Sequence, residues 1–518
     1  MSIKQGSIEF EKTIADLVSQ DGNEKALFQE LLQAYLEGHL CIEKAEKIES
    51  PFIENIRLGQ KRFETLIGRW DNLYYLQRSY VVETKIFDLL KSIMGAHVKP
   101  LDIQAFQPLN RGQKEAVKKA LKSAFFCLTG GPGTGKTHTI VSIIYSYLYG
   151  SRGSVVILAP TGKAATVLKK RIFHDELNTF ASCADRIEIT TLHKYFALRP
   201  GVDPVWLKRG LGDSLCIVDE ASMIDTDWWV ALLSAVSPQT RLVVCGDPHQ
   251  LPPVEIGSVF FEICKALKFL DRVCFKELTS CMRTDNKEIL SLAEKIKKGN
   301  GHDPIAFETD LDWEEVMMTL PLPKILEGDH KNISTAVVKA FFKQFMHVRI
   351  LSPLKKGPWG TNLINKKTFE FMRRRFQEGE TLVVPIMVVK NDASLGLSNG
   401  DLGLVFKTDN SLEFAPDEVC FFIREGAAIS IPLALLPAYE ISYALSVHKS
   451  QGSEFEHVLL LLPPGSENFG REVAYTAVTR AKKSVRVISD EETVKAVLSN
   501  SGVRNSGLSL RFSKLDNF

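Results

Sequence analysis

The sequence predicts an α/β protein of several domains, and three observations support this fold class. Short apolar runs that suit buried strands alternate with segments that suit helices over much of the chain after residue 109. A glycine-rich loop within Leu128–Thr139 (LTGGPGTGKTHT) joins one such strand to one such helix. The chain has 518 residues, too many for one compact core, so we expect about three or four domains.

Composition and charge are those of an ordinary globular protein. Hydrophobic residues make up 45% of the chain and charged residues 24%, the net charge is +2, and no apolar run is long enough to cross a bilayer. The first residues (MSIKQGSIEFEK) lack the basic and then apolar pattern of an export signal. The nine cysteines include no C-x-x-C pair, which argues against a zinc site, an iron–sulfur cluster or a disulfide framework. We therefore expect a cytoplasmic protein without membrane contact.

Residues 1–100 are predicted to form a helical docking domain. Leucines recur at roughly helical spacing between Leu17 and Leu36, and Val81–Ile93 is a second helical candidate. The region holds 13 Lys and Arg against 15 Asp and Glu, whereas phosphate binding needs clustered cations. An accessory or docking role is therefore favoured over DNA binding.

Residues 101–300 are predicted to form the first α/β domain, which contains the phosphate-binding loop. In loops of this spacing, backbone N–H groups surround the phosphates, the lysine reaches the β- and γ-phosphates, and the hydroxyl binds Mg²⁺. Gln113, seventeen positions before the loop's first glycine, is expected to read adenine through its amide. The other expected nucleotide contacts are Gly130, Gly131, Pro132, Gly133, Thr134, Gly135, Lys136 and Thr137, and Thr137 is also an expected Mg²⁺ ligand.

Later segments of this domain end in groups suited to hydrolysis. The apolar run Leu215–Val218 leads directly into two carboxylates, of which Asp219 is expected to bind Mg²⁺ and Glu220 to polarise the attacking water. Gln250 follows the next strand and is placed to sense the γ-phosphate. Arg283 offers a cation for the charge that develops in the transition state.

Two turns of the first domain suit a phosphodiester backbone. Pro160, Thr161 and Lys163 follow the strand SVVILA, where a hydroxyl, backbone N–H groups and a lysine meet the carboxyl edge of the sheet. Thr191 and His193 repeat this arrangement more weakly, because such a pair is as often involved in packing as in ligand contact. We expect all five residues to contact DNA.

Residues 320–518 are predicted to form a second α/β domain. Within it, residues 380–438 change to short alternating strands with turns, which indicates a small β insertion. Arg480 begins the last turn of a helical segment just before a strand and can present its guanidinium across a cleft to the nucleotide. The last residues, Ser499–Phe518, are predicted to be frayed.

Taken in order, these motifs resemble those of superfamily 1 helicases, and within that superfamily the RecD branch. The motifs that carry the resemblance are TGGPGTGKT, APTGKAA, DEASMID, GDPHQLPPVEIG, NGDLG, VHKSQGSEF and YTAVTRAK, with GHLCIE and NLYYLQRSYVVE near the N-terminus. The resemblance implies two RecA-like P-loop lobes with ATP and Mg²⁺ between them, an SH3-like β insertion in the second lobe, and 5′→3′ movement on single-stranded DNA. It also implies that His448 and Lys449 contact DNA, that Glu454 contacts the nucleotide, and that RecB and RecC are partners in double-strand-break repair and recombination.

Some alternatives stay open at this point. A stand-alone translocase would share every motor residue, and an ATP-gated DNA clamp would share the fold with a vestigial motor. RNA is open as a substrate because the backbone contacts do not read the 2′-OH. Arg283 is followed by Thr284, where the family commonly has Gln, which leaves its nucleotide contact in doubt. No clustered nuclease motif follows the last helicase motif, so any nuclease activity is expected in a partner.

Overall fold

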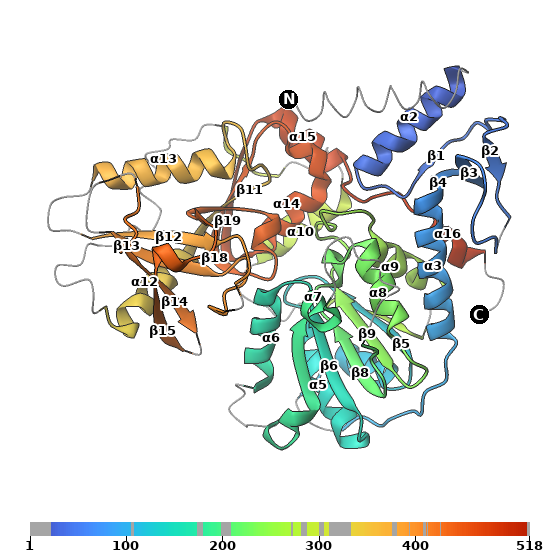
Figure 1. The fold of residues 1–518 in the computed structure, drawn as a ribbon, viewed down its shortest axis with the longest axis horizontal. Helices are drawn as coiled ribbons and strands as arrows, with labels where there is room; N and C mark the ends of the chain where they lie inside the picture. Colours follow the sequence, from blue (N-terminus) through green and yellow to red (C-terminus); the bar gives the residue numbers. More distant parts are fainter. Residues whose placement is uncertain are drawn as a thin grey trace.

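The fold consists of two lobes with parallel sheets, an antiparallel insertion sheet and an N-terminal region (Figure 1). The computed structural model describes residues 22–57, 59–104, 108–173, 180–197, 209–270, 273–280, 287–299, 305–309, 333–375, 381–392, 394–407, 411, 413–424 and 426–514. Within these ranges no helix combines the length and the apolar character that a membrane crossing requires.

Lobe 1 is a six-stranded parallel sheet with strand order β10-β5-β9-β8-β6-β7. Its strands are β5 (Phe125–Gly130), β6 (Ser154–Ala159), β7 (Ile187–Thr191), β8 (Ser214–Val218), β9 (Arg241–Gly246) and β10 (Phe275–Leu278). Its helices are α4 (Arg111–Ala120), α5 (Lys136–Gly150), α6 (Gly162–Phe173), α7 (Leu192–Phe196), α8 (Thr226–Ser234) and α9 (Val259–Phe269). Because all six strands run parallel, the loops that follow them meet at one carboxyl edge.

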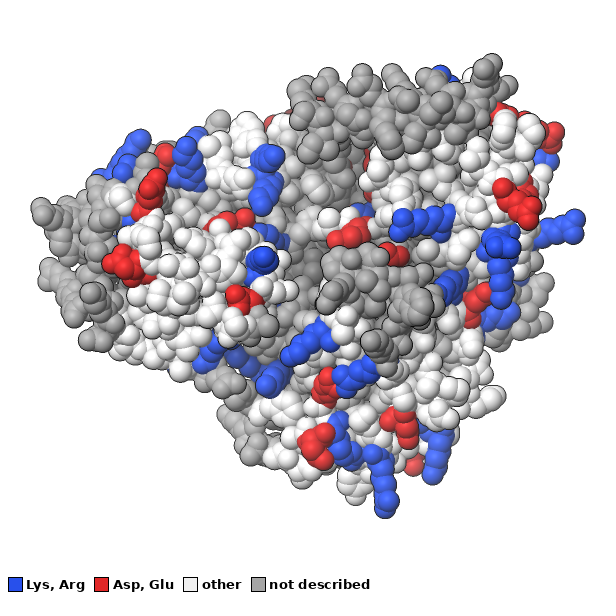
Figure 2. Space-filling view, viewed as in Figure 1, with Lys and Arg blue, Asp and Glu red and all other residues white. Residues whose placement is uncertain are grey.

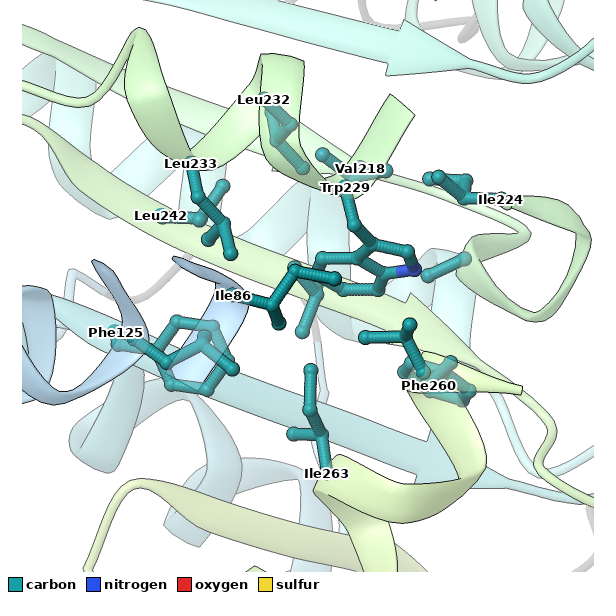
Figure 3. Packing of buried hydrophobic residues seen from close by; sticks show 14 of the residues in the cluster. Ile86, Phe125, Val218, Ile224, Trp229, Leu232, Leu233, Leu242, Phe260 and Ile263 are labelled. Carbon is teal, nitrogen blue, oxygen red and sulfur yellow. The ribbon is translucent and has the colours of Figure 1, made fainter. Parts of the chain in front are cut away.

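Both faces of the lobe 1 sheet are buried, as a parallel sheet requires. Along β5, Phe125 faces one apolar cluster and Phe126 the other. On the first face, Trp229 of α8 and Ile263 of α9 lie close to Ile86 of the N-terminal helix α3 (Gln77–Met94; Figure 3). The N-terminal region therefore shares a core with lobe 1.

Lobe 2 is a four-stranded parallel sheet with strand order β17-β11-β18-β19. Its strands are β11 (Val348–Ser352), β17 (Ala444–Ser446), β18 (Phe455–Leu462) and β19 (Ala481–Ser489). Its helices are α10 (Lys287–Lys298), α12 (Thr335–His347), α13 (Thr361–Arg374), α14 (Gly470–Val478) and α15 (Glu491–Ser499). Helix α10 lies within the range 101–300 predicted for the first domain, but its buried Ile289, Ala293 and Ile296 belong to the lobe 2 core.

The insertion sheet has five antiparallel strands in the order β15-β14-β13-β12-β16. These strands are β12 (Leu382–Val388), β13 (Leu402–Lys407), β14 (Val419–Arg424), β15 (Ala427–Pro432) and β16 (Tyr439–Ile441). A β insertion was predicted over residues 380–438, and β16 carries the sheet to Ile441, close to the start of β17. The SH3-like description stays a prediction.

The N-terminal region is more mixed than the helical prediction for residues 1–100. Helices α2 (Gly22–Leu36) and α3 (Gln77–Met94) flank a four-stranded sheet of order β1-β4-β3-β2. The strands are β1 (Cys41–Glu43), β2 (Ile53–Asn55), β3 (Ile67–Trp70) and β4 (Leu73–Leu76). Three- and four-residue strands are too short to show a clear alternating pattern in the sequence, which is why the sheet was missed.

The prediction of a frayed tail is wrong for Asn500–Lys514, here called the C-terminal segment. The segment leaves lobe 2 after α15 and ends in α16 (Leu508–Ser513), which packs against α9 and α3 (Figure 1). Its backbone N–H groups bind three buried carboxylates. Gly502 N donates to Glu472 of α14 over 2.7 Å, Gly507 N to Glu83 of α3 over 2.8 Å, and Ser509 N to Glu262 of α9 over 3.1 Å. These hydrogen bonds and the burial of Leu508 and Phe512 in the lobe 1 core together order the segment.

Candidate nucleotide and DNA site

The phosphate-binding loop joins β5 to α5, so its backbone lies at the N-terminus of a fifteen-residue helix. Gly135 has φ +84, and a Cβ there would collide with the Gln113 amide. Lys136 Nζ donates to the carbonyl oxygens of Gly130 over 2.6 Å and of Gly131 over 3.1 Å. The predicted loop residues are therefore brought together, and the lysine spans the opening of the loop.

Gln113 lies beside this loop as a buried residue at the start of α4. Its backbone N–H binds Asn110 Oδ1 over 2.9 Å, and its Oε1 accepts from Asn110 N over 3.0 Å, forming a capping box. A cavity of about 400 Å³ lies next to it, lined by α4 residues, by Thr134 and by the end of β10. The cavity has the size of a small-ligand site. The capping box occupies the oxygen of Gln113, so its adenine contact stays a prediction.

The acidic pair follows β8. Glu220 has φ +51, and a non-glycine residue in this left-handed conformation marks a backbone that its surroundings hold under strain. Loss of hydration, and then the neighbouring Glu220 carboxylate, raises the pKa of Asp219 to about 6. Lys136 lowers it, which places the lysine within electrostatic reach of Asp219. Lys136 and the acidic pair thus lie at the same end of the sheet, after β5 and β8.

Gln250 follows β9, which lies between β5 and β8 in the sheet. Its side chain is 5% exposed, and among the described residues Oε1 has no hydrogen-bond partner. A buried amide oxygen without a partner is costly unless a ligand or water completes its bonding. The role predicted for Gln250, sensing of the γ-phosphate, stays a prediction.

Helix α14 of lobe 2 contacts this edge of lobe 1. Tyr475 Oη donates to Asp247 Oδ2 over 2.9 Å, and Leu251 N donates to Thr476 Oγ1 over 2.8 Å. A Cβ at Gly131 would lie 3.4 Å from Tyr475 Oη, so this hydroxyl is also next to the phosphate-binding loop. The loop after β9 is thus bonded directly to lobe 2.

Arg480 and Glu454 lie on the lobe 2 side. Arg480 is 5% exposed, and its guanidinium donates to Thr476 O over 3.1 Å and to Ser453 O over 3.5 Å. Glu454 forms an ion pair with Lys482 over 3.3 Å. Both side chains bind within lobe 2 in this structure, so their predicted nucleotide contacts stay predictions. Arg283 lies outside the described residues.

The predicted DNA contacts of lobe 1 lie at the ends of neighbouring strands β6 and β7. Thr161 Oγ1 accepts from Ala164 N and Thr191 Oγ1 accepts from Lys194 N, each over 3.2 Å. Loss of hydration, and then Arg349, lowers the pKa of Lys163 to about 8. Pro160 and His193 belong to the same two turns, and the imidazole of His193 packs 4.2 Å from the ring of Trp228. The sheet brings these turns together, but both hydroxyls already cap helices.

The predicted DNA contacts of lobe 2 follow the end of β17. Loss of hydration, and then Arg504, lowers the pKa of His448 to about 4, so its imidazole is neutral at pH 7. Lys449 Nζ binds Glu440 of β16, and Lys355, which follows the neighbouring strand β11, binds the same carboxylate over 3.4 Å. The cations at this edge are therefore already paired within the chain.

Charge on the visible face is mixed, as the net charge suggests. Figure 2 shows Lys and Arg side chains interspersed with Asp and Glu, with several cations along the boundary between lobe 2 and lobe 1. A boundary of this kind can contact a polyanion without giving the whole protein a strong basic charge.

The sequence interpretation gave no role to Asp247, Tyr475 or Glu440. The first two lie inside motifs that it quoted, GDPHQLPPVEIG and YTAVTRAK. The partners Tyr475 and Asp247 are 228 positions apart in the chain, so nothing local pairs them.

Comparisons with known proteins agree with this geometry. The AAA domain family matches residues 108–315, and the UvrD-like helicase C-terminal domain family matches residues 442–488. The RecBCD enzyme subunit RecD of Mycolicibacterium smegmatis is 31% identical over 483 residues, covering 88% of this chain and 84% of that relative. The ATP-dependent RecD2 DNA helicase of Deinococcus radiodurans is 30% identical over 428 residues, covering 79% of this chain and 54% of that relative.

Among solved structures, the Pif1 helicase from Candida albicans is similar, with a TM-score of 0.45 and 18% identity, covering 79% of this chain and 99% of that one. The chain is 31% identical to a RecD subunit over most of both chains. It also has two lobes with parallel sheets, a phosphate-binding loop and the ordered motifs. On these grounds, the chain belongs to the RecD family of superfamily 1 helicases.

Proposed function

We propose that this chain is an ATP-driven motor that moves 5′→3′ on single-stranded DNA as the RecD-type subunit of a RecBCD-type helicase and nuclease. One observation carries the proposal. The phosphate-binding loop, the acidic pair and Gln250 follow the adjacent strands β5, β8 and β9, and α14 of lobe 2 contacts the same edge. A nucleotide held there would touch both lobes, so hydrolysis could change how they sit together.

Each lobe 1 residue has a role that fits its position. Lys136 exchanges two backbone carbonyls for phosphate oxygens, which are the stronger acceptors because they are charged. Glu220 polarises the attacking water, and the unpaired Oε1 of Gln250 accepts from that water and orients it. The loop backbone and Thr137 hold the phosphates, and the cavity beside α4 takes the base.

The donor set also fits a magnesium ion. Asp219 offers a buried carboxylate whose pKa is raised by loss of hydration and then by Glu220, and Thr137 offers a hydroxyl at the start of α5. Bound Mg²⁺ would neutralise charge that develops between the β- and γ-phosphates.

On the lobe 2 side, Arg480 is proposed to stabilise the transition-state charge and Glu454 to contact the nucleotide. Arg283, which lies outside the described residues, is proposed as a second cation for that charge. Arg480 must exchange backbone carbonyls for phosphate to do so, which requires movement of its segment. The guanidinium then completes the site only in a closed cleft, which ties hydrolysis to lobe movement.

RecB and RecC are the proposed partners, with RecC on the N-terminal region. The relative named as a RecBCD subunit is covered over 84% of its length, whereas the RecD2 helicase is covered over 54%. This favours the subunit over the stand-alone enzyme. Nuclease activity of the complex is proposed to reside in a partner.

The test is ATP hydrolysis stimulated by single-stranded DNA, followed by unwinding of 5′-tailed and 3′-tailed duplexes, with and without co-expressed RecB and RecC. Lys136→Ala should lower stimulated hydrolysis by at least about 100-fold, because it removes a charged contact to the transferring phosphate. Lys122→Ala, at an exposed lysine at the opposite edge of lobe 1, is the matched control and should change it less than about twofold.

The outcomes separate the proposals. Unwinding of 5′-tailed substrates with co-purification of RecB and RecC supports the subunit assignment. Absence of hydrolysis both alone and in the complex contradicts the motor, and full activity without partner binding contradicts the subunit assignment.

A further inference from the structure

Lysines gather at the carboxyl edge of the lobe 2 sheet, where a ligand of a parallel sheet is expected. Lys355 follows β11 and Lys449 follows β17, and these two strands are hydrogen-bonded neighbours through Ser352 and Ser446. A phosphodiester backbone that crosses this edge would therefore meet both ammonium groups.

One carboxylate already binds both lysines. Glu440 lies on β16, opposite Met387 of β12, so the insertion sheet holds it beside the edge. Its Oε1 binds Lys449, and its Oε2 lies 3.4 Å from Lys355 Nζ. The Lys449 and Glu440 side chains are each 30% exposed and that of Lys355 is 61% exposed, so solvent and a ligand can reach the cluster.

We propose that Glu440 sets the affinity of the chain for single-stranded DNA by competing with phosphate for Lys355 and Lys449. A carboxylate between two ammonium groups presents the same charge and acceptor oxygens as a DNA phosphate. DNA must displace it to bind, and the carboxylate returns as a phosphate leaves. The inference rests on the proposed function, because it takes this edge to be part of the DNA path.

A second contact of the insertion sheet agrees with this role. A Cβ at Gly162 of the lobe 1 DNA turn would lie 2.9 Å from Ser398 Oγ, so the turn before β13 touches the turn after β6. In that turn, Asp401 Oδ2 accepts from Ser398 N over 2.8 Å, which holds this carboxylate beside the contact. The insertion sheet thus brings a carboxylate to the lobe 1 turn as well as to the lobe 2 edge.

The expected size of the change in DNA affinity follows from the solvent exposure of the two ion pairs that Glu440 forms. Partly exposed ion pairs each change an equilibrium by at most about fivefold, and salt screens them. Glu440→Gln should therefore lower the dissociation constant for a single-stranded oligonucleotide by about two- to tenfold at low salt. A DNA concentration for half-maximal ATPase stimulation that falls by a similar factor is a second readout.

The control variant must remove the same negative charge from a glutamate that also binds a lysine but lies outside the proposed DNA path. Glu456 is suitable because it binds Lys483 over 2.6 Å, its side chain is 31% exposed, and it lies near the amino end of β18. Fluorescence anisotropy with a labelled oligonucleotide is measured for the wild type, Glu440→Gln, Glu456→Gln, and each in a Lys355→Ala/Lys449→Ala background. Unfolding midpoints check that every variant is folded, and Glu440→Ala replaces Glu440→Gln if the latter is not.

The proposal requires that Glu440→Gln tightens binding, that Glu456→Gln does so by a smaller factor, and that the Glu440 effect vanishes in the double-lysine background. Equal effects of the two glutamates, or tightening that persists without the lysines, would overturn it, because general charge would then explain the result. If the double-lysine variant binds DNA as well as the wild type, the DNA path proposed for this edge fails instead, and the inference fails with it.

Discussion

At the residue scale, the contact between Tyr475 and Asp247 joins the two lobes at the nucleotide site. Asp247 is 1% exposed, and its two oxygens accept from His249 N over 3.0 Å and from Tyr475 Oη over 2.9 Å. The nearby carboxylate also raises the pKa of Tyr475 after the larger effect of burial, which keeps the hydroxyl protonated as a donor. The phenolic hydroxyl is therefore hydrogen-bonded to the loop that carries Gln250.

Tyr475→Phe removes only the hydroxyl of this contact. A buried carboxylate that loses one hydrogen-bond donor loses about 1.5–3 kcal/mol of stabilisation. This loss destabilises the arrangement in which α14 contacts lobe 1. We expect the maximal DNA-stimulated ATPase rate to fall by at least about tenfold, while KM for ATP changes by less than about twofold, because the phosphate contacts stay in lobe 1. Steady-state kinetics at saturating DNA measure both.

The matched control is Tyr195→Phe. Tyr195 is also buried, and its hydroxyl donates to Gly210 O over 3.3 Å within lobe 1. This variant should lose stability without the selective fall in maximal rate. Equal kinetics in the two variants would show that the Tyr475 hydroxyl has no coupling role.

At the element scale, α16 is held by an ion pair between Arg511 and Glu83. Arg511 Nε lies 2.8 Å from Glu83 Oε1, and the two side chains are 3% and 1% exposed. Tyr75 Oη, Ser506 Oγ and Gly507 N also donate to this carboxylate. Arg511, Ser506 and Gly507 belong to the C-terminal segment, so this one carboxylate ties the segment to α3.

Arg511→Met should lower the free energy of unfolding by about 3–5 kcal/mol, because removing one partner leaves a buried charge without its counterion. The double variant with Glu83→Gln should cost less than the sum of the single variants. Urea unfolding measures these differences. Asp71→Asn is the control, because Asp71 and Lys514 form an exposed pair that should contribute less than about 1 kcal/mol. Equal losses at both sites would contradict a special role for the buried pair.

Elements that a short stretch of sequence specifies could be predicted from the sequence. The phosphate-binding loop, the acidic pair after β8 and the turn after β9 follow apolar strands, and the structure places them on adjacent strands of one sheet. The C-terminal segment was predicted to be frayed because its contacts lie far away in the chain: hydrogen bonds to Glu83, Glu262 and Glu472, and apolar packing of Leu508 and Phe512 in the lobe 1 core. The roles of Arg480 and Lys449 depend on a bound ligand. Neither the local sequence pattern nor the contacts within the folded chain identify that ligand.

At the scale of the whole molecule, hydrogen bonds between described residues join the lobes at the nucleotide edge and through the C-terminal segment. At the nucleotide edge, Gln451 Nε2 of lobe 2 also donates to Leu251 O over 3.3 Å. In the C-terminal segment, Arg504 N binds Ser258 Oγ of lobe 1 over 3.1 Å after the segment has left lobe 2. A nucleotide that binds lobe 1 should therefore stabilise parts of lobe 2.

Hydrogen exchange tests this coupling. Binding at 100 times the dissociation constant stabilises the bound state by about 2.7 kcal/mol, and regions that open together share that protection. A non-hydrolysable ATP analogue with Mg²⁺ should slow exchange in the phosphate-binding loop and also in α14. It should leave exchange in β14 and β15 unchanged within about twofold, because these strands belong to the insertion sheet and not to the nucleotide edge.

Lys136→Ala should abolish both protections, since both depend on the bound phosphates. Tyr475→Phe should keep the protection of the loop and lose most of that in α14, because it cuts the contact between the lobes without touching lobe 1. Protection confined to lobe 1 in the wild type would mean that the nucleotide binds one lobe only. The movement of lobe 2 would then have to be driven by DNA rather than by ATP.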